Sequence, residues 1–345
     1  LSNATLNDFS VDEDVSAGYV MANLDFGAVT VTPGLRYEHT RLGITGFRLE
    51  KGTAVVPARS RNNYDDWLPS LIVRIAPSSN TIVRFAYSRS LGRPNYSQLS
   101  PGGSVSYEDG PTAGTFNGSV SLGNPLLKPY RANNLDASAE WYFTKGGLIS
   151  IGLFAKFIQN PIFTQSYTQN NVTFDGRNYV TLGFSQPLNA DKGDIIGIEA
   201  AYQQQFSFLP GLLSGFGIEI NGTLTDSSLR LPDGRSSTFP QQSRYLYGAQ
   251  LFYQKGRVEA SIAYHNTGHS LLATGALPYQ DQYNNDLRRL DAKASVEIFK
   301  GVSVFAEAQN LTDEPTRQYQ AGHSDWITQN ERYGRTYYGG VSAKF

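Results

Sequence analysis

The chain has 345 residues, no cysteine, one methionine and a net charge of −1. Without cysteine it forms neither disulfides nor thiolate metal sites, and without excess positive charge it has no general attraction for nucleic acid. Its apolar runs fall short of the roughly 18 residues that a membrane-spanning helix needs. The first residues lack the basic stretch and apolar core of a signal peptide, so we expect a processed chain or a fragment.

Most of the chain consists of segments in which apolar and polar side chains alternate. In residues 131–143, for example, Leu135 and Ala137 alternate with Asp136 and Ser138. A period of two residues is typical of a β-strand. The pattern predicts thirteen strands, at about 15–26, 28–47, 64–76, 81–90, 131–143, 147–160, 193–206, 215–227, 243–254, 257–267, 285–299, 302–311 and 331–345.

The connections between these segments alternate between short turns and long polar loops. The short turns have the sequences FG, PSSN, TKGG, LPGLLSG, QKG and FKG, and the long loops include 48–62, 91–129, 161–190 and 268–284. Short turns at one end and long loops at the other are typical of bacterial outer-membrane barrels. Any single strand would also fit a soluble β-sandwich. Such a fold, however, has no reason to place short turns at one end and long loops at the other.

The charged side chains are sorted by face. In the predicted strands 147–160, 243–254 and 257–267, and from Leu290 to Ile298 in the strand 285–299, the apolar face carries no charge and the polar face does. A charge that faces lipid costs roughly 2–4 kcal/mol at mid-bilayer, whereas a charge in a wet lumen is hydrated. We therefore predict an all-β fold, an antiparallel transmembrane β-barrel with a polar lumen.

The last predicted strand places Ala343 and Phe345 on its apolar face, which suits the closing strand of an outer-membrane barrel. Thirteen is an odd number, whereas bacterial barrels have even numbers of strands. Either one strand is miscounted, or part of the barrel lies upstream of Leu1. If thirteen is right, the first and last strands run parallel, and we expect an open or strained seam between them.

Four motifs occur in the order in which one known family has them. They are SRSLGRPNYSQLSP at 88–101, SLGNPLLKPYRANNLD at 121–136, FAEAQNLTDEPTRQY at 305–319 and ERYGRTYYGGVSAKF at 331–345. With these motifs, the chain from about Tyr19 to Phe345 resembles the C-terminal half of a TonB-dependent outer-membrane receptor. The resemblance implies that residues 1–345 are a partial domain of a plugged barrel of roughly 22 strands. The plug, the TonB box and the remaining strands are absent from this chain.

The resemblance also implies a function, the energised uptake of a scarce nutrient across the bacterial outer membrane. The expected partners are TonB, ExbB and ExbD, through the missing N-terminal part, together with outer-membrane lipid, lipopolysaccharide and a small-molecule nutrient. No cofactor, metal or nucleic acid is expected. The first alternative is a passive diffusion porin, which would conduct ions where a plugged receptor is nearly closed.

The second alternative is an outer-membrane hydrolase that uses His265. No nucleophile motif accompanies this histidine, so we expect neither catalytic residues nor enzymatic activity. His265 and His269 would lie about 13 Å apart on a strand, which is too far for a shared metal ion.

Two groups of residues are candidates for function. Those expected to face the lumen or the plug are Arg89, Arg244, Glu259, Arg289, Asp291 and Lys293. Those expected to contact substrate from the loops are Arg93, Tyr96, Tyr107, Asn117, Tyr167, Asn171, Tyr279 and Trp326. Arg93 lies where a strand leaves the bilayer, so it either anchors the loop or contacts the ligand directly.

The loop candidates mix aromatic rings with amides and contain few charges. This composition suits stacking on sugars, so a carbohydrate or oligosaccharide is the favoured substrate. A siderophore is the other substrate considered, although a catecholate or citrate siderophore would favour clustered arginines.

Overall fold

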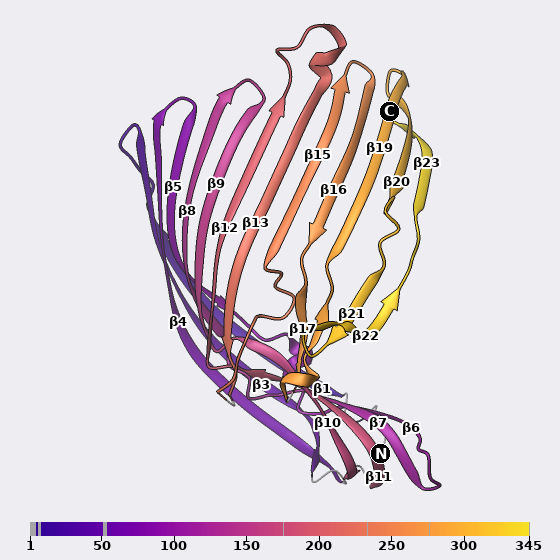
Figure 1. Ribbon diagram of the computed structural model, residues 1–345. Coiled ribbons are helices and arrows are strands. Elements are labelled where there is room, and N and C mark those ends of the chain that lie inside the picture. The colour runs from indigo at the N-terminus through magenta and orange to yellow at the C-terminus, as the bar shows by residue number, and fades with distance from the viewer. Residues whose placement is uncertain are drawn as a thin grey trace.

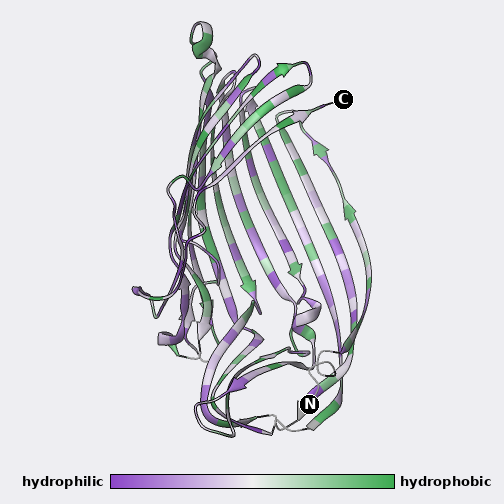
Figure 2. Cartoon of the chain, turned by 90° about the vertical axis from the view of Figure 1, so that its right-hand side faces the viewer, coloured by the Kyte–Doolittle hydropathy of each residue, from purple (hydrophilic) through white to green (hydrophobic). Residues whose placement is uncertain are grey.

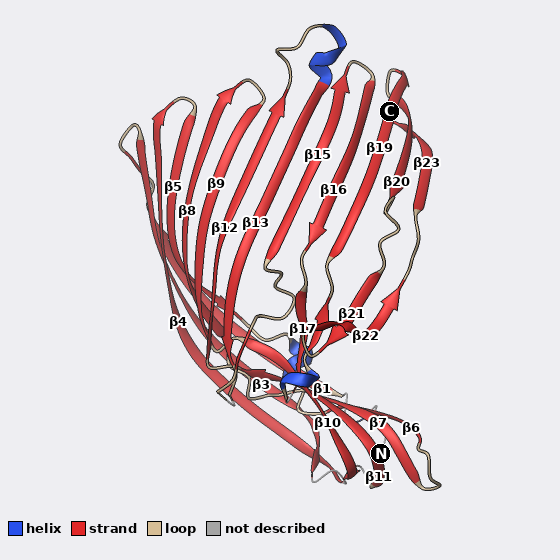
Figure 3. Ribbon diagram, viewed as in Figure 1, coloured by secondary structure: helices blue, strands red, loops and turns tan. Residues whose placement is uncertain are grey.

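The computed structural model describes Thr5 and residues 8–50, 54–174, 176–232, 234–275 and 277–344. Its elements are strands and three short 3-10 helices, η1 (Tyr96–Leu99), η2 (Gly211–Gly215) and η3 (Pro278–Gln280), all located in connections (Figure 3). Within these ranges no helix has both the length and the apolar character needed to cross a bilayer. The strands form two sheets, a main sheet and a smaller one built from the long connections (Figure 1).

The main sheet follows a path of thirteen strands, and every neighbouring pair along this path is antiparallel. Its strands are β1 (Phe9–Met21), β3 (Val29–Glu50), β4 (Ala54–Ser78), β5 (Thr81–Gly92), β8 (Tyr130–Thr144), β9 (Gly147–Gln159), β12 (Lys192–Gln205), β13 (Phe216–Arg230), β15 (Tyr245–Lys255), β16 (Val258–Thr267), β19 (Leu287–Phe299), β20 (Val302–Gln309) and β23 (Thr336–Ala343). Two short strands join at the side, β2 (Leu24–Asp25) on β3 and β14 (Ser236–Ser237) on β13. The thirteen predicted strands are confirmed. Phe345 lies outside the described residues.

The register separates the side chains of the main sheet into a polar and an apolar face. Lys293 is in register with Ser261 on one side and Glu307 on the other, and cross-strand partners share a face. Ile262 follows Ser261 on β16 and therefore lies on the opposite face. There it is in register with Leu251 of β15. Figure 2 shows this alternation as purple and green segments along the strands. The charged set and the lipid-compatible set therefore lie on opposite sides of one wall, as predicted.

The two edges of the main sheet do not meet. Among the described residues, β1 pairs only with β3 in this sheet, and β23 pairs only with β20. Because thirteen strands alternate in direction, β1 and β23 run parallel and cannot join by antiparallel pairing. The open seam is confirmed (Figure 1).

The smaller sheet, called the loop sheet here, lies at the end of the molecule opposite the short turns. Its strands, in spatial order, are β22 (His323–Glu331), β21 (Thr316–Gln320), β18 (Gln282–Asn284), β17 (Ser270–Gly275), β10 (Ile162–Phe174), β11 (Arg177–Asn189), β7 (Thr115–Leu122) and β6 (Gly103–Asp109). Two of its pairs, β10 with β17 and β11 with β7, are parallel. The prediction of polar loops at 91–129, 161–190 and 268–284 is therefore wrong for much of their length.

The loop sheet has an apolar core of its own. Tyr179, Leu182 and Val120 are at most 1% exposed, and they cluster with Val105 and Phe184. Burying side chains of this size stabilises the sheet by roughly 1.5–3 kcal/mol each. This core explains why segments rich in Asn, Gln, Ser and Thr nevertheless form an ordered sheet.

The hairpin of β3 and β4 extends far beyond the predicted strand ends. A loop was expected at 48–62, but β3 continues to Glu50 and β4 starts at Ala54. Within the predicted part of β3, Leu42 and Ile44 are buried against Leu99 and Leu127 of the following long connection. The long hairpin therefore supports the loops from one side.

Candidate functional site

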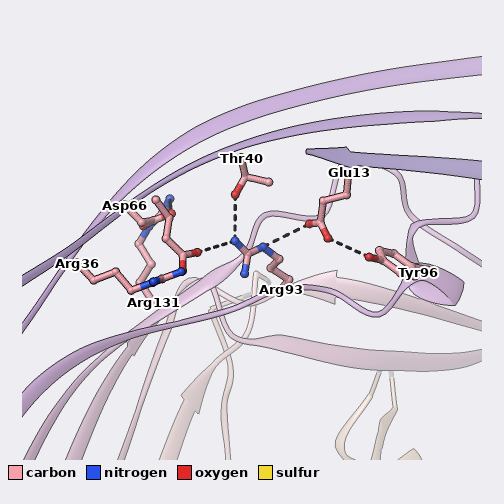
Figure 4. A network of polar contacts seen from close by, with 8 residues as sticks. Glu13, Arg36, Thr40, Asp66, Arg93, Tyr96 and Arg131 are labelled. Atoms are coloured by element: carbon pink, nitrogen blue, oxygen red, sulfur yellow. Dashed lines mark hydrogen bonds and ion pairs between the residues drawn. The ribbon is translucent and has the colours of Figure 1, made fainter. Parts of the chain in front are cut away.

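Arg93 connects three separate parts of the chain at the point where β5 ends (Figure 4). Its Nη2 lies 2.7 Å from Glu38 Oε2 and donates to Thr40 Oγ1 at 3.0 Å, both on β3. Its Nε lies 3.3 Å from Glu13 Oε1 on β1, and Tyr96 Oη donates to the other oxygen of Glu13 at 2.9 Å. The long connection after β5 is thereby fixed to the first two strands of the main sheet.

A second layer of charges surrounds this centre. Arg36 Nε donates to Glu38 Oε1 at 2.6 Å, so Glu38 binds two guanidinium groups. Close by, Arg131 forms a two-point pair with Asp66, whose side chain is 1% exposed. The hydrogen bond to Glu13 raises the pKa of Tyr96. The partners of Arg93 and Tyr96 support the loop-anchoring interpretation of these two candidates.

Tyr107 on β6 and Asn117 on β7 lie on opposite faces of the loop sheet, because Tyr107 is in register with Gly118 and Asn117 with Glu108. A surface cavity of about 640 Å³ lies on the face of Asn117, where it is lined by Ser106, Glu108, Ser119 and Thr181 and bordered by Tyr107 and Gly118. The Phe116 ring meets Tyr107 edge-on at 5.4 Å between centroids, and Arg177 Cζ lies 4.1 Å from the centroid of the Tyr107 ring. We call Tyr107, Phe116 and Arg177 the aromatic shelf, which lies on the face opposite the cavity. It presents ring surface beside a guanidinium group.

A second cavity, the hydroxyl pocket, lies between the ends of β13 and β17. Its volume is about 530 Å³, and its lining consists of Thr225, Asp226, Ser227, Ser228, Ser236, Ser237, Thr238, Gln242, Arg244, His269, Ser270, Leu271, Asp281 and Tyr283. Arg244 is the only lining residue among the functional candidates predicted from the sequence. The hydroxyls at 225–228 and 236–238 were visible in the sequence as a cluster, but nothing there showed that these two segments meet.

Asp286 fixes one wall of the hydroxyl pocket. It accepts hydrogen bonds from the His269 backbone N–H at 2.8 Å, from Tyr245 Oη at 2.8 Å and from Arg288 Nη2 at 3.0 Å. Burial alone would raise the pKa of Asp286, but these hydrogen bonds lower it. The carboxylate therefore stays charged and holds His269 at the rim of the pocket.

The remaining loop candidates are spread along the loop sheet. Tyr167 stacks on Phe184 at 5.1 Å, beside the apolar core. Asn171 lies within β10 between the pairs Asn170–Thr181 and Val172–Tyr179, with a φ of 53°, a value that Asn adopts more readily than most residues. Tyr279, on η3, is 58% exposed. Trp326, on β22, packs its ring 4.5 Å from that of His323. These residues do not form one site with the aromatic shelf.

Five of the six lumen candidates lie on the polar face. Glu259 and Lys293 line a small cavity beside Gln250, and Asp291 Oδ1 accepts a hydrogen bond from the backbone of Asn310. Arg289 lies on the same face of β19 as Lys293. Arg244 directly precedes β15 and continues the alternation of its polar face.

Arg89 is the exception among the lumen candidates. It is in register with Asn133 and shares the face of Tyr87 and Leu135, so its predicted orientation toward the lumen is wrong. The run SRS is polar at every position, and local alternation therefore did not reveal its face.

The main sheet has one charged and one apolar face, and its short and long connections lie at opposite ends. Together these features define a membrane-spanning β-barrel. The chain belongs to the TonB-dependent receptor-like β-barrel family, whose model matches residues 2–311. It is therefore a protein of the bacterial outer membrane, and the end with the long connections is extracellular. No curated protein matches the chain.

Several solved structures resemble the chain. The ferric-catecholate import receptor Fiu of E. coli K12 has a TM-score of 0.68 at 15% identity, over 98% of this chain and 45% of that one. The siderophore receptor PiuA of Acinetobacter baumannii has 0.67 at 15%, over 98% and 44%. The ferric enterobactin receptor PfeA of Pseudomonas aeruginosa, in complex with enterobactin, has 0.59 at 17%, over 98% and 55%. The chain thus spans about half the length of these receptors, and at such identities the likeness concerns the fold.

Proposed function

We propose that this chain is part of a receptor that imports an iron–siderophore chelate across the outer membrane with energy supplied through TonB. The observation that carries the proposal is the family match, together with structural neighbours named as ferric-catecholate, siderophore and ferric enterobactin receptors. The comparisons do not support the carbohydrate preference suggested by the loop composition. TonB, ExbB and ExbD are the proposed energy-coupling partners, and the chain itself is proposed to have no enzymatic activity.

The aromatic shelf and the hydroxyl pocket suit a chelate of the catecholate class. Such a ligand has flat aromatic rings and a negative charge, and the shelf offers aromatic rings together with the Arg177 guanidinium, which lies over the Tyr107 ring. The hydroxyl pocket adds Arg244, His269 and several Ser and Thr hydroxyls that can donate hydrogen bonds to anionic oxygens. Clustered arginines are thus not the only cationic arrangement available in these loops.

Iron-limited growth tests the function. The complete polypeptide encoded by the gene is expressed in a host without its own siderophore receptors, and ferric enterobactin is supplied as the only usable iron. We expect growth that disappears when the host lacks TonB. Growth without TonB would instead indicate a porin. No growth on enterobactin or other catecholate and hydroxamate chelates, combined with TonB-dependent uptake of an oligosaccharide, would overturn the siderophore assignment.

Exchanging Tyr107 for leucine is expected to weaken ferric enterobactin binding to the whole receptor by about tenfold. The reason is that the exchange removes both the ring face and its contact with Arg177, together worth about 1–2 kcal/mol. The dissociation constant is measured by fluorescence quenching. Tyr333→Leu, at an exposed tyrosine that lines neither cavity, is the matched control and should leave it unchanged. Equal affinities for the two variants would exclude the aromatic shelf from the binding site.

A further inference from the structure

The apolar face of the main sheet contains a groove that runs across β4, β5, β8, β9 and β12. Its volume is about 530 Å³. It is lined by Leu71, Val73, Phe85, Ala86, Tyr87, Leu135, Asp136, Ala137, Leu153, Phe154, Ala155, Ile196 and Gly197. The groove belongs to the outside of the wall, away from the two extracellular cavities.

The groove arises from the order of large and small side chains in two rows, each of which runs across neighbouring strands. In one row Leu71, Tyr87 and Leu135 are followed by Ala155. In the next row Phe85 is followed by Ala137 and then by Leu153. Each alanine stands between large side chains and leaves a depression. The depressions join because Ala137 and Ala155 lie diagonally to one another.

Hydrocarbon is the occupant that fits this lining. The groove lies on the face that meets lipid, and its side-chain walls offer aromatic and aliphatic surface. A polar ligand would lose its hydration there without gaining hydrogen bonds. A flexible acyl chain gains contact with Leu135 and Leu153 without such a cost. The apolar part of the occupant is therefore a lipid chain.

Arg89 lies directly beyond the groove in the extracellular direction. It follows Tyr87 by two residues on β5 and shares the same face. Its Nε is buried and has no hydrogen-bond partner among the described residues. Opposite it, Asn133 accepts a hydrogen bond from Tyr87 Oη at 3.1 Å, so the amide is oriented. A buried guanidinium nitrogen without an acceptor calls for an anionic oxygen.

Trp67 indicates that Arg89 lies near the membrane surface. It belongs to the apolar alternation of β4, is 56% exposed and contacts the Tyr37 ring at 4.8 Å between centroids. Exposed Trp and Tyr residues form the aromatic girdles at the two ends of a membrane barrel. An arginine at this level meets lipid head groups, where a charge costs little.

We propose that the groove and Arg89 form a binding site for lipid A, the phosphorylated, acylated glycolipid of the outer leaflet. One acyl chain occupies the groove between Leu135 and Leu153, and a phosphate oxygen accepts a hydrogen bond from Arg89. The site is independent of the nutrient cavities. On the apolar faces of β15, β16 and β19 the cation at the extracellular end is Arg288, which is already paired with Asp286 at 3.0 Å, so this part of the wall serves as an internal comparison.

The test measures lipid A retained by the whole receptor. The complete polypeptide is purified in detergent, titrated with hexa-acylated lipid A and examined by native mass spectrometry. Arg89→Gln and Ala155→Phe are each expected to lower the affinity by about tenfold, through the lost charged hydrogen bond and the filled groove respectively. Arg61→Gln, at an exposed arginine of β4, and Ala292→Phe, on the apolar face of β19, are the matched controls and should bind like the wild type.

Two further lipids decide which part of the occupant is recognised. Dephosphorylated lipid A should bind wild-type receptor about as weakly as lipid A binds the Arg89→Gln variant. Phosphatidylglycerol should bind more weakly than lipid A. Unchanged lipid A binding by both groove variants would overturn the proposal, as would equal binding of lipid A and phosphatidylglycerol. Folding is confirmed for every variant by heat-modifiable migration in SDS gels, and TonB-dependent uptake by the variants is scored separately.

Discussion

Replacing Leu251 by arginine is expected to destabilise the folded barrel by about 2–4 kcal/mol, because the new charge lies near mid-bilayer on the apolar face. Leu251 is in the middle part of β15, is 45% exposed and has Ile262 as its cross-strand neighbour. The effect is measured as the shift in the urea concentration that unfolds the complete receptor in lipid vesicles.

Gln250→Arg is the matched control for this variant. Gln250 is the preceding residue of the same strand, and it is in register with Glu219 on the polar face. The arginine there is hydrated and gains an opposite charge, so unfolding should occur within about 0.5 kcal/mol of the wild type. Equal destabilisation by the two exchanges would show that the assignment of the two faces is wrong.

Exchanging Arg93 for alanine is expected to loosen the connection between β5 and β8 by about 2 kcal/mol. The exchange leaves the carboxylates of Glu13 and Glu38 without their shared partner, while 30% exposure of the Arg93 side chain allows water to compensate in part. A protease that cuts within 93–129 should therefore act about thirtyfold faster, because cleavage follows the population of the opened segment.

Two other variants show whether the Arg93 geometry matters. Arg93→Lys keeps the charge but cannot contact Glu13, Glu38 and Thr40 at once, so an intermediate rate of cleavage is expected. Arg61→Ala removes an exposed arginine and should leave the rate unchanged. If Arg93→Ala is cut no faster than the wild type, the loop is held by its apolar contacts at Leu99 and Leu127 instead.

The main sheet could be predicted from sequence because each of its strands carries its own signal. Lipid on one side and water on the other impose a period of two on every strand, as in the alternation of Leu251 and Gln250. The short turns supply a second local signal, since Gly146, Gly256 and Gly301 all adopt the positive φ that their turns require. Each hairpin was therefore recognisable without knowledge of the others.

The loop sheet could not be predicted in this way because its pairing partners belong to different connections. Gln165 on β10 pairs with Thr274 on β17, and Phe184 on β11 pairs with Val120 on β7. Both contacts are parallel and join segments far apart in the chain. A strand such as β7 does alternate, with Phe116, Val120 and Leu122 on one face, but the alternation does not show which other connection supplies its partner.

The sequence predicted the types of residue in the candidate site better than it predicted which of them come together. Tyr107 and Asn117 were singled out and lie on neighbouring strands but on opposite faces, and the hydroxyl pocket combines two serine-rich segments that only the fold brings together. The position of Arg93 at a strand exit was evident, but its carboxylate partners lie on β1 and β3, far back in the sequence. Charge pairs across distant strands leave no local pattern.

The long-range pairs of the loop sheet also determine when it can form. Closing a connection between Gln165 and Thr274 carries the entropic cost of a large loop, unless the hairpins between them are already in place. Once the main sheet has formed, its hairpins shorten the effective loop between these two residues. Assembly is therefore sequential, with the membrane wall first and the extracellular layer last. This order would make the extracellular surface the slowest part of the molecule to mature.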